Sequence, residues 1–416
     1  MPDLRVRSAV IPFDTGTISS MFVLLIVCAL LVAASMAAQA QTFSVIHNFT
    51  GTGGDGVNPD AGVTLRAGSL YGTTCCGGSN NHGTVYQITQ VGSNWVTMPI
   101  SLFAGGGFNP IARVVFGPDG HPYGTTSDSP EGPGRVFDLI VPLTICKTAN
   151  CFWKENVLYK FQGGADGAYP GYGDVVWDEQ GNIYGTTTAG GASNLGAVYE
   201  LTPAGNSYTG SALYNFSGTD GKTPLGGVVL DGRGDVFGTT LSGGAYGVGT
   251  VFKLTKQDGR WVESTMHDFE GSSDGSGPYA GLLLDSFGNL YGTTSGGGVG
   301  HGGTVFELIP SGESYTFKLL YSFSNASGCG PFAGLTFDGV GNLYGTTRCG
   351  GANRLGTVFE LTNTGNGWTY TSLHDFTGGD GAYPISNVTI DANGNLYGTA
   401  STGGSQNLGV VWMIKR

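Results

Sequence analysis

Charged side chains are scarce in this sequence, and common catalytic motifs are missing from it. Asp, Glu, Lys and Arg make up 12% of the 416 residues, which is about half of their usual share in soluble proteins. There is no Gly-X-Y period, so the 76 glycines do not indicate a collagen-like fibre. There is also no phosphate-binding loop, no H-E-x-x-H motif and no C-x-x-C zinc pair. Motifs alone therefore indicate no class of enzyme.

An excess of basic residues is missing as well. The formal net charge is −12, and an acidic protein repels nucleic acids and anionic membrane surfaces. Beyond the N-terminal segment, no apolar run is long enough to span a membrane. We therefore expect neither nucleic acid as a partner nor a membrane span in the mature chain. Abundant Gly, Thr, Tyr and Phe are instead typical of β-sheets with many tight turns.

Residues 1–40 have the features of a secretory signal peptide. Arg5 and Arg7 precede an apolar run over residues 21–34, and small residues then form a cleavage site that ends at Ala40. This order predicts a mature chain that is secreted, or held in the periplasm or cell envelope of a bacterium.

Other interpretations of this segment are weaker. A retained membrane helix is disfavoured because the cleavage site follows the apolar run directly and no basic stop-transfer residues do. Lipidation at Cys28 would need a small residue before it, where Val27 stands. Met21 is an alternative start, because the region before the apolar run is long.

Two landmarks recur along the chain with the same count and period. The tripeptide Tyr/Phe-Gly-Thr begins at Tyr71, Tyr123, Tyr184, Phe237, Tyr291, Tyr344 and Tyr397. A Phe that ends a strand-like run stands at Phe49, Phe103, Phe161, Phe216, Phe269, Phe323 and Phe376. Because both landmarks recur every 52–61 residues, we infer seven tandem units.

Each unit contains four strand-like stretches. In the sixth unit they lie at 333–337, 342–347, 356–361 and 368–376, with an Asp-x-x-Gly turn between the first two. Such a turn suits a tight hairpin, because Gly adopts a positive φ and Asp accepts backbone hydrogen bonds. Four strands per unit without a helical period predict an all-β, seven-bladed β-propeller with antiparallel blades.

The two ends of the repeat predict how the ring closes. The last unit has stretches at 386–391, 396–399 and 409–414 but no fourth one, and residues 42–49 form an extra fourth-type stretch. We expect 42–49 to complete the last blade, which would hide sheet edges. One domain of residues 41–416 is then expected, with blades at about 60–103, 110–161, 170–216, 224–269, 278–323, 331–376 and 384–416 plus 42–49.

The stretch GNLYGTTRCGGANRLGTVFEL at 341–361 resembles the bacterial GloVer tandem repeat of the choice-of-anchor tandem-repeat proteins. The resemblance covers nearly all of residues 42–416. It implies an extracellular, propeller-like repeat protein, and it implies no activity and no catalytic residues. Many members end in an anchoring segment. This sequence ends on its last expected strand, so anchoring by that route is not expected.

Positions that break the repeat are the best candidates for a binding site, because one ligand rarely needs seven equal contacts. One position on the expected innermost strand carries Gly62, Arg113, Asp174, Gly227, Gly281, Gly334 and Asn387. Arg113 and Asp174 fall in adjacent blades, where they form either a polar site for a sugar or carboxylate or a structural ion pair. Asn387 is the third polar residue of this circle.

The repeated loops of one face offer less specific candidates. Asp-Gly begins at Asp55, Asp166, Asp220, Asp274 and Asp380, and Gly-Gly at Gly77, Gly190, Gly243, Gly297, Gly350 and Gly403. These loops are either a binding surface or turn chemistry shared by all blades, and turn chemistry is favoured at any single position. His47, His267 and His374 share one repeat position, which also indicates a structural role.

Blade 2 departs further from the repeat, because its second loop carries Asp128 and Glu131 in place of Gly-Gly. Carboxylate pairs about 5–9 Å apart catalyse glycoside hydrolysis, and Asp128, Glu131 and Asp174 offer such a pair. No cofactor is indicated. The stretch 391–395 is similar to a calcium loop but lacks its later Glu, so calcium is a weak alternative to a hairpin turn.

Six cysteines follow the expected cleavage site, and an even number suggests disulfides in an exported chain. The candidate pairs are Cys329 with Cys349, Cys146 with Cys151, and Cys75 with Cys76. The first pair would join neighbouring loops of one face, and the second would staple an insertion in blade 2. The third pair, which is adjacent in sequence, forms a strained vicinal bond or stays reduced.

These features favour a secreted binding or scaffold module for an extracellular polysaccharide or a protein partner. The reason is a regular ring, low in charge, without a recognisable catalytic group. One alternative is a carbohydrate-active hydrolase or lyase, with its site at the channel mouth near Arg113, Asp174 and Asn387. Another is a purely structural component of the envelope.

Overall fold

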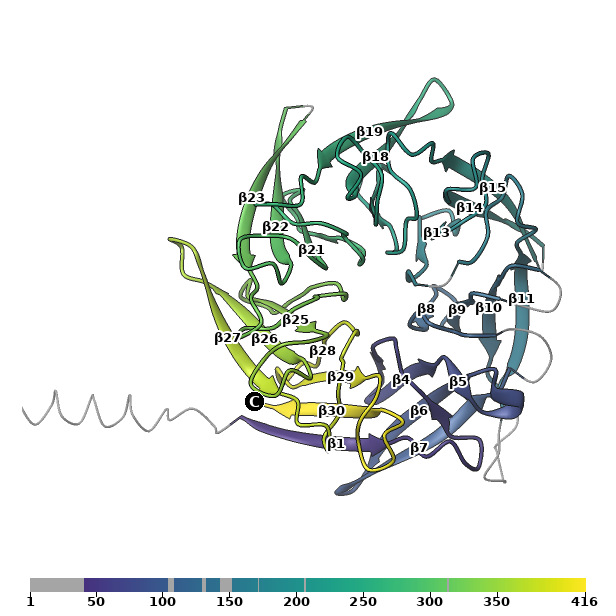
Figure 1. The fold of residues 1–416 in the computed structure, drawn as a ribbon. Helices are drawn as coiled ribbons and strands as arrows, with labels where there is room; N and C mark the ends of the chain where they lie inside the picture. Colours follow the sequence, from purple (N-terminus) through teal and green to yellow (C-terminus); the bar gives the residue numbers. More distant parts are fainter. Residues whose placement is uncertain are drawn as a thin grey trace, which may run out of the picture. The chain divides into compact units, whose positions relative to one another are not determined.

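The structure is a computed structural model that describes residues 41–103, 108–128, 132–142, 152–170, 172–205, 207–312 and 314–416. The expected signal peptide lies outside these ranges, as do Glu131, Cys146 and Cys151. Phe43–Lys415 form one unit, in which seven four-stranded antiparallel sheets surround a central axis (Figure 1).

Each blade orders its strands from the centre outwards. Blade 1 is β3 (Thr64–Arg66), β4 (Ser69–Thr74), β6 (Thr84–Val91) and β7 (Asn94–Ser101). Blade 2 is β8 (Val115–Phe116), β9 (Pro122–Thr126), β10 (Arg135–Ile140) and β11 (Lys154–Lys160). Blade 3 is β12 (Val176–Trp177), β13 (Ile183–Thr187), β14 (Ala197–Ala204) and β15 (Ser207–Asn215). Blade 4 is β16 (Val229–Leu230), β17 (Val236–Thr240), β18 (Thr250–Gln257) and β19 (Arg260–Asp268).

The remaining blades follow the same plan. Blade 5 is β20 (Leu283–Leu284), β21 (Leu290–Thr294), β22 (Thr304–Ser311) and β23 (Ser314–Ser322). Blade 6 is β24 (Thr336–Phe337), β25 (Leu343–Thr347), β26 (Thr357–Asn363) and β27 (Trp368–Asp375). Blade 7 is β28 (Thr389–Ile390), β29 (Leu396–Ala400), β30 (Val410–Lys415) and β1 (Thr42–Asn48).

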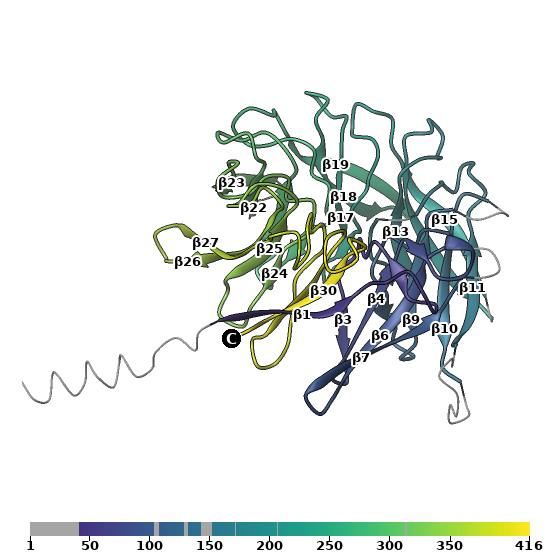
Figure 2. The same ribbon diagram turned by 60° about the horizontal axis from the view of Figure 1, so that its bottom comes forward.

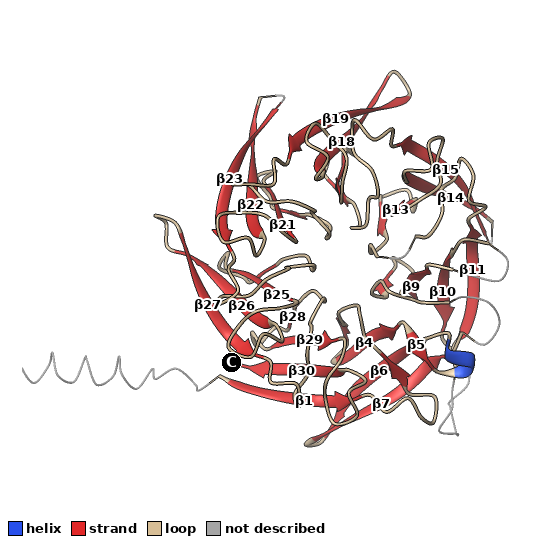
Figure 3. Ribbon diagram, viewed as in Figure 1, coloured by secondary structure: helices blue, strands red, loops and turns tan. Residues whose placement is uncertain are grey.

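The all-β, seven-bladed propeller expected from the repeat is confirmed. The N-terminal strand β1 pairs with β30 and completes the last blade, as expected, so that purple and yellow strands lie side by side in Figures 1 and 2. Strands dominate the described part of the chain (Figure 3). Outside the blades, β2 (Gly56–Val57) pairs with β5 (Cys76–Gly77), and one short 3-10 helix spans Ser79–Asn81.

The hydrophobic core lies between neighbouring blades. The Phe that ends each fourth strand is at most 2% exposed, and its ring packs against an aromatic ring on the third strand of the next blade. The centroids of these rings lie 5.0–6.3 Å apart, in the pairs Phe49–Tyr86, Phe103–Phe137, Phe161–Tyr199, Phe216–Phe252, Phe269–Phe306, Phe323–Phe359 and Phe376–Trp412. Burial of each such Phe contributes about 1.5–3 kcal/mol.

In the blades whose motif begins with Tyr, the first two residues of the motif hold the blade together. In blade 6, the hydroxyl of Tyr344 lies 3.1 Å from Oδ2 of Asp338 and 2.6 Å from Oε1 of Glu360. It thereby ties the first hairpin to the third strand. A Cβ on Gly345 would overlap the ring of Phe359, so glycine is required beneath that ring.

The threonine of the motif joins each blade to the next one. Its hydroxyl donates a hydrogen bond of 2.8–3.0 Å to a backbone carbonyl that precedes the neighbour's first strand. Six joints have this bond: Thr73 to Ala112, Thr186 to Gly226, Thr239 to Ala280, Thr293 to Ala333, Thr346 to Ser386 and Thr399 to Ala61. Between blades 2 and 3, the buried hydroxyl of Thr125 has no hydrogen-bond partner among the described residues.

We expect Thr293→Val to lower the free energy of unfolding by about 1–3 kcal/mol, because it leaves the carbonyl of Ala333 buried without its donor. Thr125→Val is a matched control, since both threonines are 2% exposed and the hydroxyl of Thr125 makes no bond to lose. Equilibrium unfolding in guanidinium chloride measures both variants. Equal losses in the two would contradict the role given to this hydrogen bond.

Candidate binding site at the mouth of the central channel

A cavity of about 320 Å³ lies at the centre of the ring, between the innermost strands. Its volume falls in the range of small-molecule sites. One circle of lining residues is the variable repeat position, with Gly62, Arg113, Asp174, Gly227, Gly281, Gly334 and Asn387. A second circle lies two residues earlier in the repeat, with Asp60, Ile111, Tyr172, Tyr279, Phe332 and Ile385.

Three glycines of the first circle, Gly62, Gly227 and Gly281, are required by the close approach of neighbouring backbones. A Cβ on Gly281 would lie 2.9 Å from the carbonyl oxygen of Gly227, and a Cβ on Gly62 would lie 2.8 Å from that of Asn387. Such contacts exclude side chains from these positions. The polar residues of this circle are therefore exceptions to a strict steric rule.

Arg113 and Asp174 form an ion pair in this circle. Nε and Nη2 of Arg113 both donate to Oδ2 of Asp174, at 2.8 and 2.5 Å. The side chains are 27% and 23% exposed. Burial lowers the pKa of Arg113, but the Asp174 carboxylate raises it by more, so the guanidinium stays charged. No hydrogen bond to Oδ1 of Asp174 occurs in the described part of the chain, which leaves this oxygen available to a ligand.

The other predicted ligand-binding residues are less central. Asn387 lines the cavity, and its side-chain oxygen accepts a hydrogen bond of 2.8 Å from the backbone N–H of Gly334 in the preceding blade. Asp128 is exposed, its backbone pairs with Phe108, and it does not line the cavity. Glu131 lies outside the described residues. The structure therefore does not bring Asp128 to Asp174 as a pair of carboxylates.

The Asp-Gly loops use their carboxylates to hold their own backbone. Each Asp accepts a bond from a His or Tyr side chain of the preceding fourth strand. The pairs are His47–Asp55, Tyr159–Asp166, Tyr214–Asp220, His267–Asp274 and His374–Asp380. The first glycine of each Gly-Gly loop has a φ between 71° and 80°. These contacts support turn chemistry, and they give the three histidines a structural role.

The stretch that resembles a calcium loop is also a hairpin turn. Oδ1 of Asp391 accepts hydrogen bonds from the backbone N–H groups of Asn393 and Asn395, at 2.8 and 2.9 Å. Its Oδ2 accepts bonds from the side chains of Asn395 and Tyr397, at 2.8 and 3.1 Å. Burial raises the pKa of Asp391, but these hydrogen bonds lower it by more, so that its pKa is below the ordinary value. Both oxygens therefore serve the turn.

An arc of aromatic side chains is the main feature that the sequence did not reveal. The rings of Tyr172 and Tyr279 meet edge to face at 5.7 Å, and those of Tyr279 and Phe332 at 4.9 Å. The guanidinium of Arg348 lies 5.8 Å from the ring centroid of Phe332 and 5.7 Å from that of Tyr383, within the range of cation–π attraction. Tyr172 is 45% exposed and Tyr383 is 37% exposed.

Asp60 is a second residue that sequence reasoning missed. It occupies a position where other blades carry Ile, Leu, Tyr or Phe, and this difference was the available signal. Burial raises the pKa of Asp60 to about 6, against a hydrogen bond from Cys75 that lowers it.

The sulfurs of Cys75 and Cys76 are 2.7 Å apart, and both cysteines are free. The bond to Cys75 lowers the pKa of Cys76 to about 7, and the contact with Cys76 raises that of Cys75.

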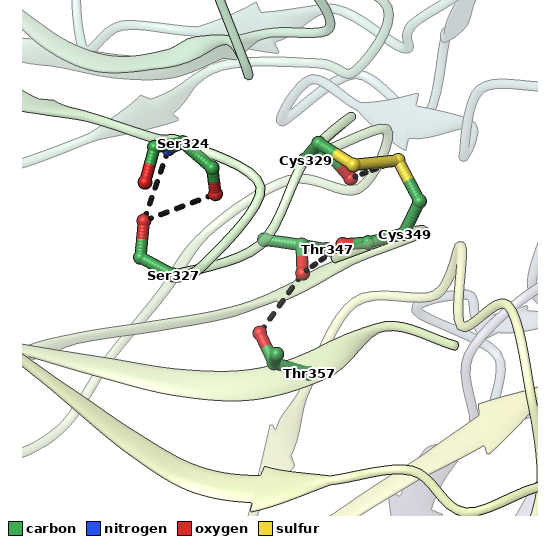
Figure 4. The surroundings of a disulfide bond; sticks show 6 residues. All are labelled: Ser324, Ser327, Cys329, Thr347, Cys349 and Thr357. Atoms are coloured by element: carbon green, nitrogen blue, oxygen red, sulfur yellow. Dashed lines mark hydrogen bonds between the residues drawn. A yellow bond between two sulfur atoms is a disulfide. The ribbon is translucent and has the colours of Figure 1, made fainter. Parts of the chain in front are cut away.

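The expected disulfide between Cys329 and Cys349 is present (Figure 4). The two residues also exchange backbone hydrogen bonds, at 2.6 and 2.9 Å. Closing a loop of this length contributes about 3 kcal/mol in chain-entropy terms. Because Arg348 precedes Cys349 and Phe332 follows Cys329 closely, the bond fixes two segments that carry residues of the aromatic arc.

A family model described as the Gloeobacter/Verrucomicrobia repeat matches residues 144–339 and 229–416 of the chain. No curated protein matches the sequence. Within the described residues, no helix is long and apolar enough to cross a membrane.

Several solved structures share the fold at low sequence identity. The extracellular domain of a one-component system from B. thetaiotaomicron is 13% identical, with a TM-score of 0.52, over 90% of this chain and 40% of that one. A protein from Lactobacillus plantarum is 13% identical, with a TM-score of 0.50, over 76% and 84%. A protein assigned as a 6-phosphogluconolactonase from Bacteroides uniformis reaches 15% identity and a TM-score of 0.47, over 76% and 84%. For the first two of these structures, the likeness at such identities extends to the fold alone.

The raised pKa of Asp60 predicts a pH-dependent loss of stability. Its pKa is about 6 in the folded protein and about 3.9 in an unfolded chain, so ionisation between these values destabilises the fold. We expect Asp60→Asn to match the native protein near pH 4 and to exceed its stability by about 1–3 kcal/mol above pH 7. Urea unfolding of both proteins across this range measures the difference. A variant that is less stable than the native protein above pH 7 would contradict it.

Proposed function

We propose that this chain, which belongs to the Gloeobacter/Verrucomicrobia repeat family, is an exported binding module that holds a glycan at the mouth of its central channel. The observation that carries this proposal is the aromatic arc beside the Arg113–Asp174 pair, which breaks the repeat at the innermost circle. Export follows from the signal-like segment of residues 1–40 and is part of the proposal.

The chemistry of the mouth suits a sugar better than a lipid or a polyanion. Aromatic faces such as that of Tyr172 cover the apolar C–H faces of a pyranose ring, while fixed polar groups orient its hydroxyls. Asp174 and Asn387 supply acceptors and donors for those hydroxyls. The net charge of −12 disfavours a highly anionic polymer, so a neutral polysaccharide is the expected ligand.

A second candidate function is hydrolysis or lysis of the same glycan, and Asp60 is the observation that favours it. A carboxyl with a pKa of about 6 is half protonated near pH 6 and keeps its proton in about a tenth of molecules at pH 7, and a general acid must be protonated before it can act. Asp174 lines the same cavity and would be the second carboxylate of such a reaction.

The test is calorimetric titration of the protein with a panel of neutral oligosaccharides. Tyr172→Ala is expected to weaken binding at least ~10-fold, because a stacked ring is worth about 1.5 kcal/mol. Tyr246→Ala is the matched control, since Tyr246 is 59% exposed and does not line the cavity. Unchanged affinity in Tyr172→Ala, or equal losses in both variants, would contradict a glycan site at the mouth. A panel without any binder would instead favour a protein partner.

The variant Asp60→Asn distinguishes the two candidate functions. If the protein only binds, this variant keeps its affinity and no product forms from any bound oligosaccharide. If it is an enzyme, the native protein releases product and Asp60→Asn binds the oligosaccharide without turnover. Product release that persists in the variant would exclude Asp60 as the general acid.

A further inference from the structure

A separate cluster of ligating groups lies in blade 2, in the turn between β8 and β9 and on β10. It consists of Asp119, His121 and Asp138, whose ligating atoms all lie within 4.8 Å of one another. Nδ1 of His121 is 3.2 Å from Oδ2 of Asp119 and 3.0 Å from Oδ2 of Asp138. An imidazole nitrogen thus lies between two carboxylate oxygens.

Blade 2 differs at these positions from blades of the same plan. In blades 3, 5 and 6, an Asn side chain donates to the turn Asp, and the third strand carries a Glu that the motif Tyr also contacts. These sets are Asp178, Asn182 and Glu200; Asp285, Asn289 and Glu307; Asp338, Asn342 and Glu360. Blade 2 replaces the amide donor with an imidazole and the Glu with the shorter Asp, so all three groups can ligate one ion.

Blade 4 shows how this fold balances an additional carboxylate. Nζ of Lys253 lies 2.6 Å from Asp235, and a guanidinium nitrogen of Arg233 lies 3.8 Å from the same carboxylate. Neither Asp119 nor Asp138 forms an ion pair with Lys or Arg within the described ranges. The side chain of Asp138 is only 5% exposed, so water compensates its charge poorly. In the described part of blade 2, no Lys or Arg therefore takes the place that Lys253 has beside Asp235 in blade 4.

We propose that Asp119, His121 and Asp138 bind a zinc ion. One imidazole nitrogen and two carboxylate oxygens form a ligand set that zinc accepts, and ligand separations of about 3 Å suit metal–ligand bonds of about 2 Å. Asn156 donates to Oδ1 of Asp138 at 2.7 Å, and Tyr123 donates to Asp119 at 2.9 Å. Such outer partners orient carboxylate ligands. The side chain of Asp119 is 46% exposed, which leaves an approach for the ion and for water ligands.

Zinc at this site would tie the β8–β9 turn to β10, as the Tyr and Glu contacts do in other blades. The site uses no residue of the channel mouth, so it is independent of the proposed glycan binding. Its loss would leave the affinity for oligosaccharide unchanged.

The test is calorimetric titration of the chelator-treated full chain with zinc chloride. We expect saturable binding of one ion per chain, and at least ~10-fold weaker binding in His121→Asn. This substitution installs the residue found in blades 3, 5, 6 and 7, so the fold is retained. The matched control is His301→Asn, which removes an exposed imidazole from a loop where φ is 58°, a value that Asn accepts.

A second variant, Asp138→Asn, keeps the imidazole and is also expected to weaken binding at least ~10-fold. X-ray absorption at the zinc edge is expected to show nitrogen and oxygen ligands without sulfur. Failure of the native chain to saturate below roughly 100 μM zinc, equal affinity in His121→Asn, or sulfur ligation through the free cysteines would each overturn the proposal.

Discussion

The hydrogen bond from the motif threonine to the next blade is the interaction on which the rest of the structure depends. A single blade is a four-stranded sheet that cannot bury both faces alone, so it needs a neighbour on each side. The hydroxyl of Thr293, for example, sets the distance from β21 to the segment before blade 6. The Phe that ends each fourth strand then packs against an aromatic ring on the third strand of the next blade, as Phe323 does against Phe359. Pairing of β1 with β30 joins the first and last blades by the same rules.

These joints also decide where chemistry can take place. Close approach of the backbones at the centre requires glycine in blades 1, 4 and 5, and Arg113, Asp174 and Asn387 are the departures that the geometry tolerates. Two residues earlier the circle accepts larger side chains, which is where Asp60 and the aromatic arc lie. In the loops that recur from blade to blade, the Asp side chains form hydrogen bonds with nearby residues of the same blade end, as Asp274 and Asp380 do. Positions that break the repeat are therefore the ones left for ligands.

Much of the fold could be predicted from the sequence, because the repeated landmarks are the joint residues themselves. Closure by 42–49 and the bond between Cys329 and Cys349 followed from their places in the repeat. The candidate site was predicted only in part. Arg113 and Asp174 share one repeat position in adjacent blades, whereas the raised pKa of Asp60 depends on burial, which the spacing of the repeat does not reveal. The direction of the loop that carries Asp128 likewise depends on packing that spacing does not encode.

Residues that recur in every blade form the ring, and residues at the centre that depart from the repeat bind the ligand together with the aromatic arc. Hydrogen–deuterium exchange of the full chain, with and without a bound oligosaccharide, tests this division between scaffold and binding residues most directly. Second strands such as β21 and β25 should exchange slowly and equally in both states, because their amides belong to the scaffold. Protection by the ligand should be confined to peptides that contain Asp60, Tyr172, Asp174, Phe332 or Asn387. Protection on the outer fourth strands instead, with none at these peptides, would contradict the claim.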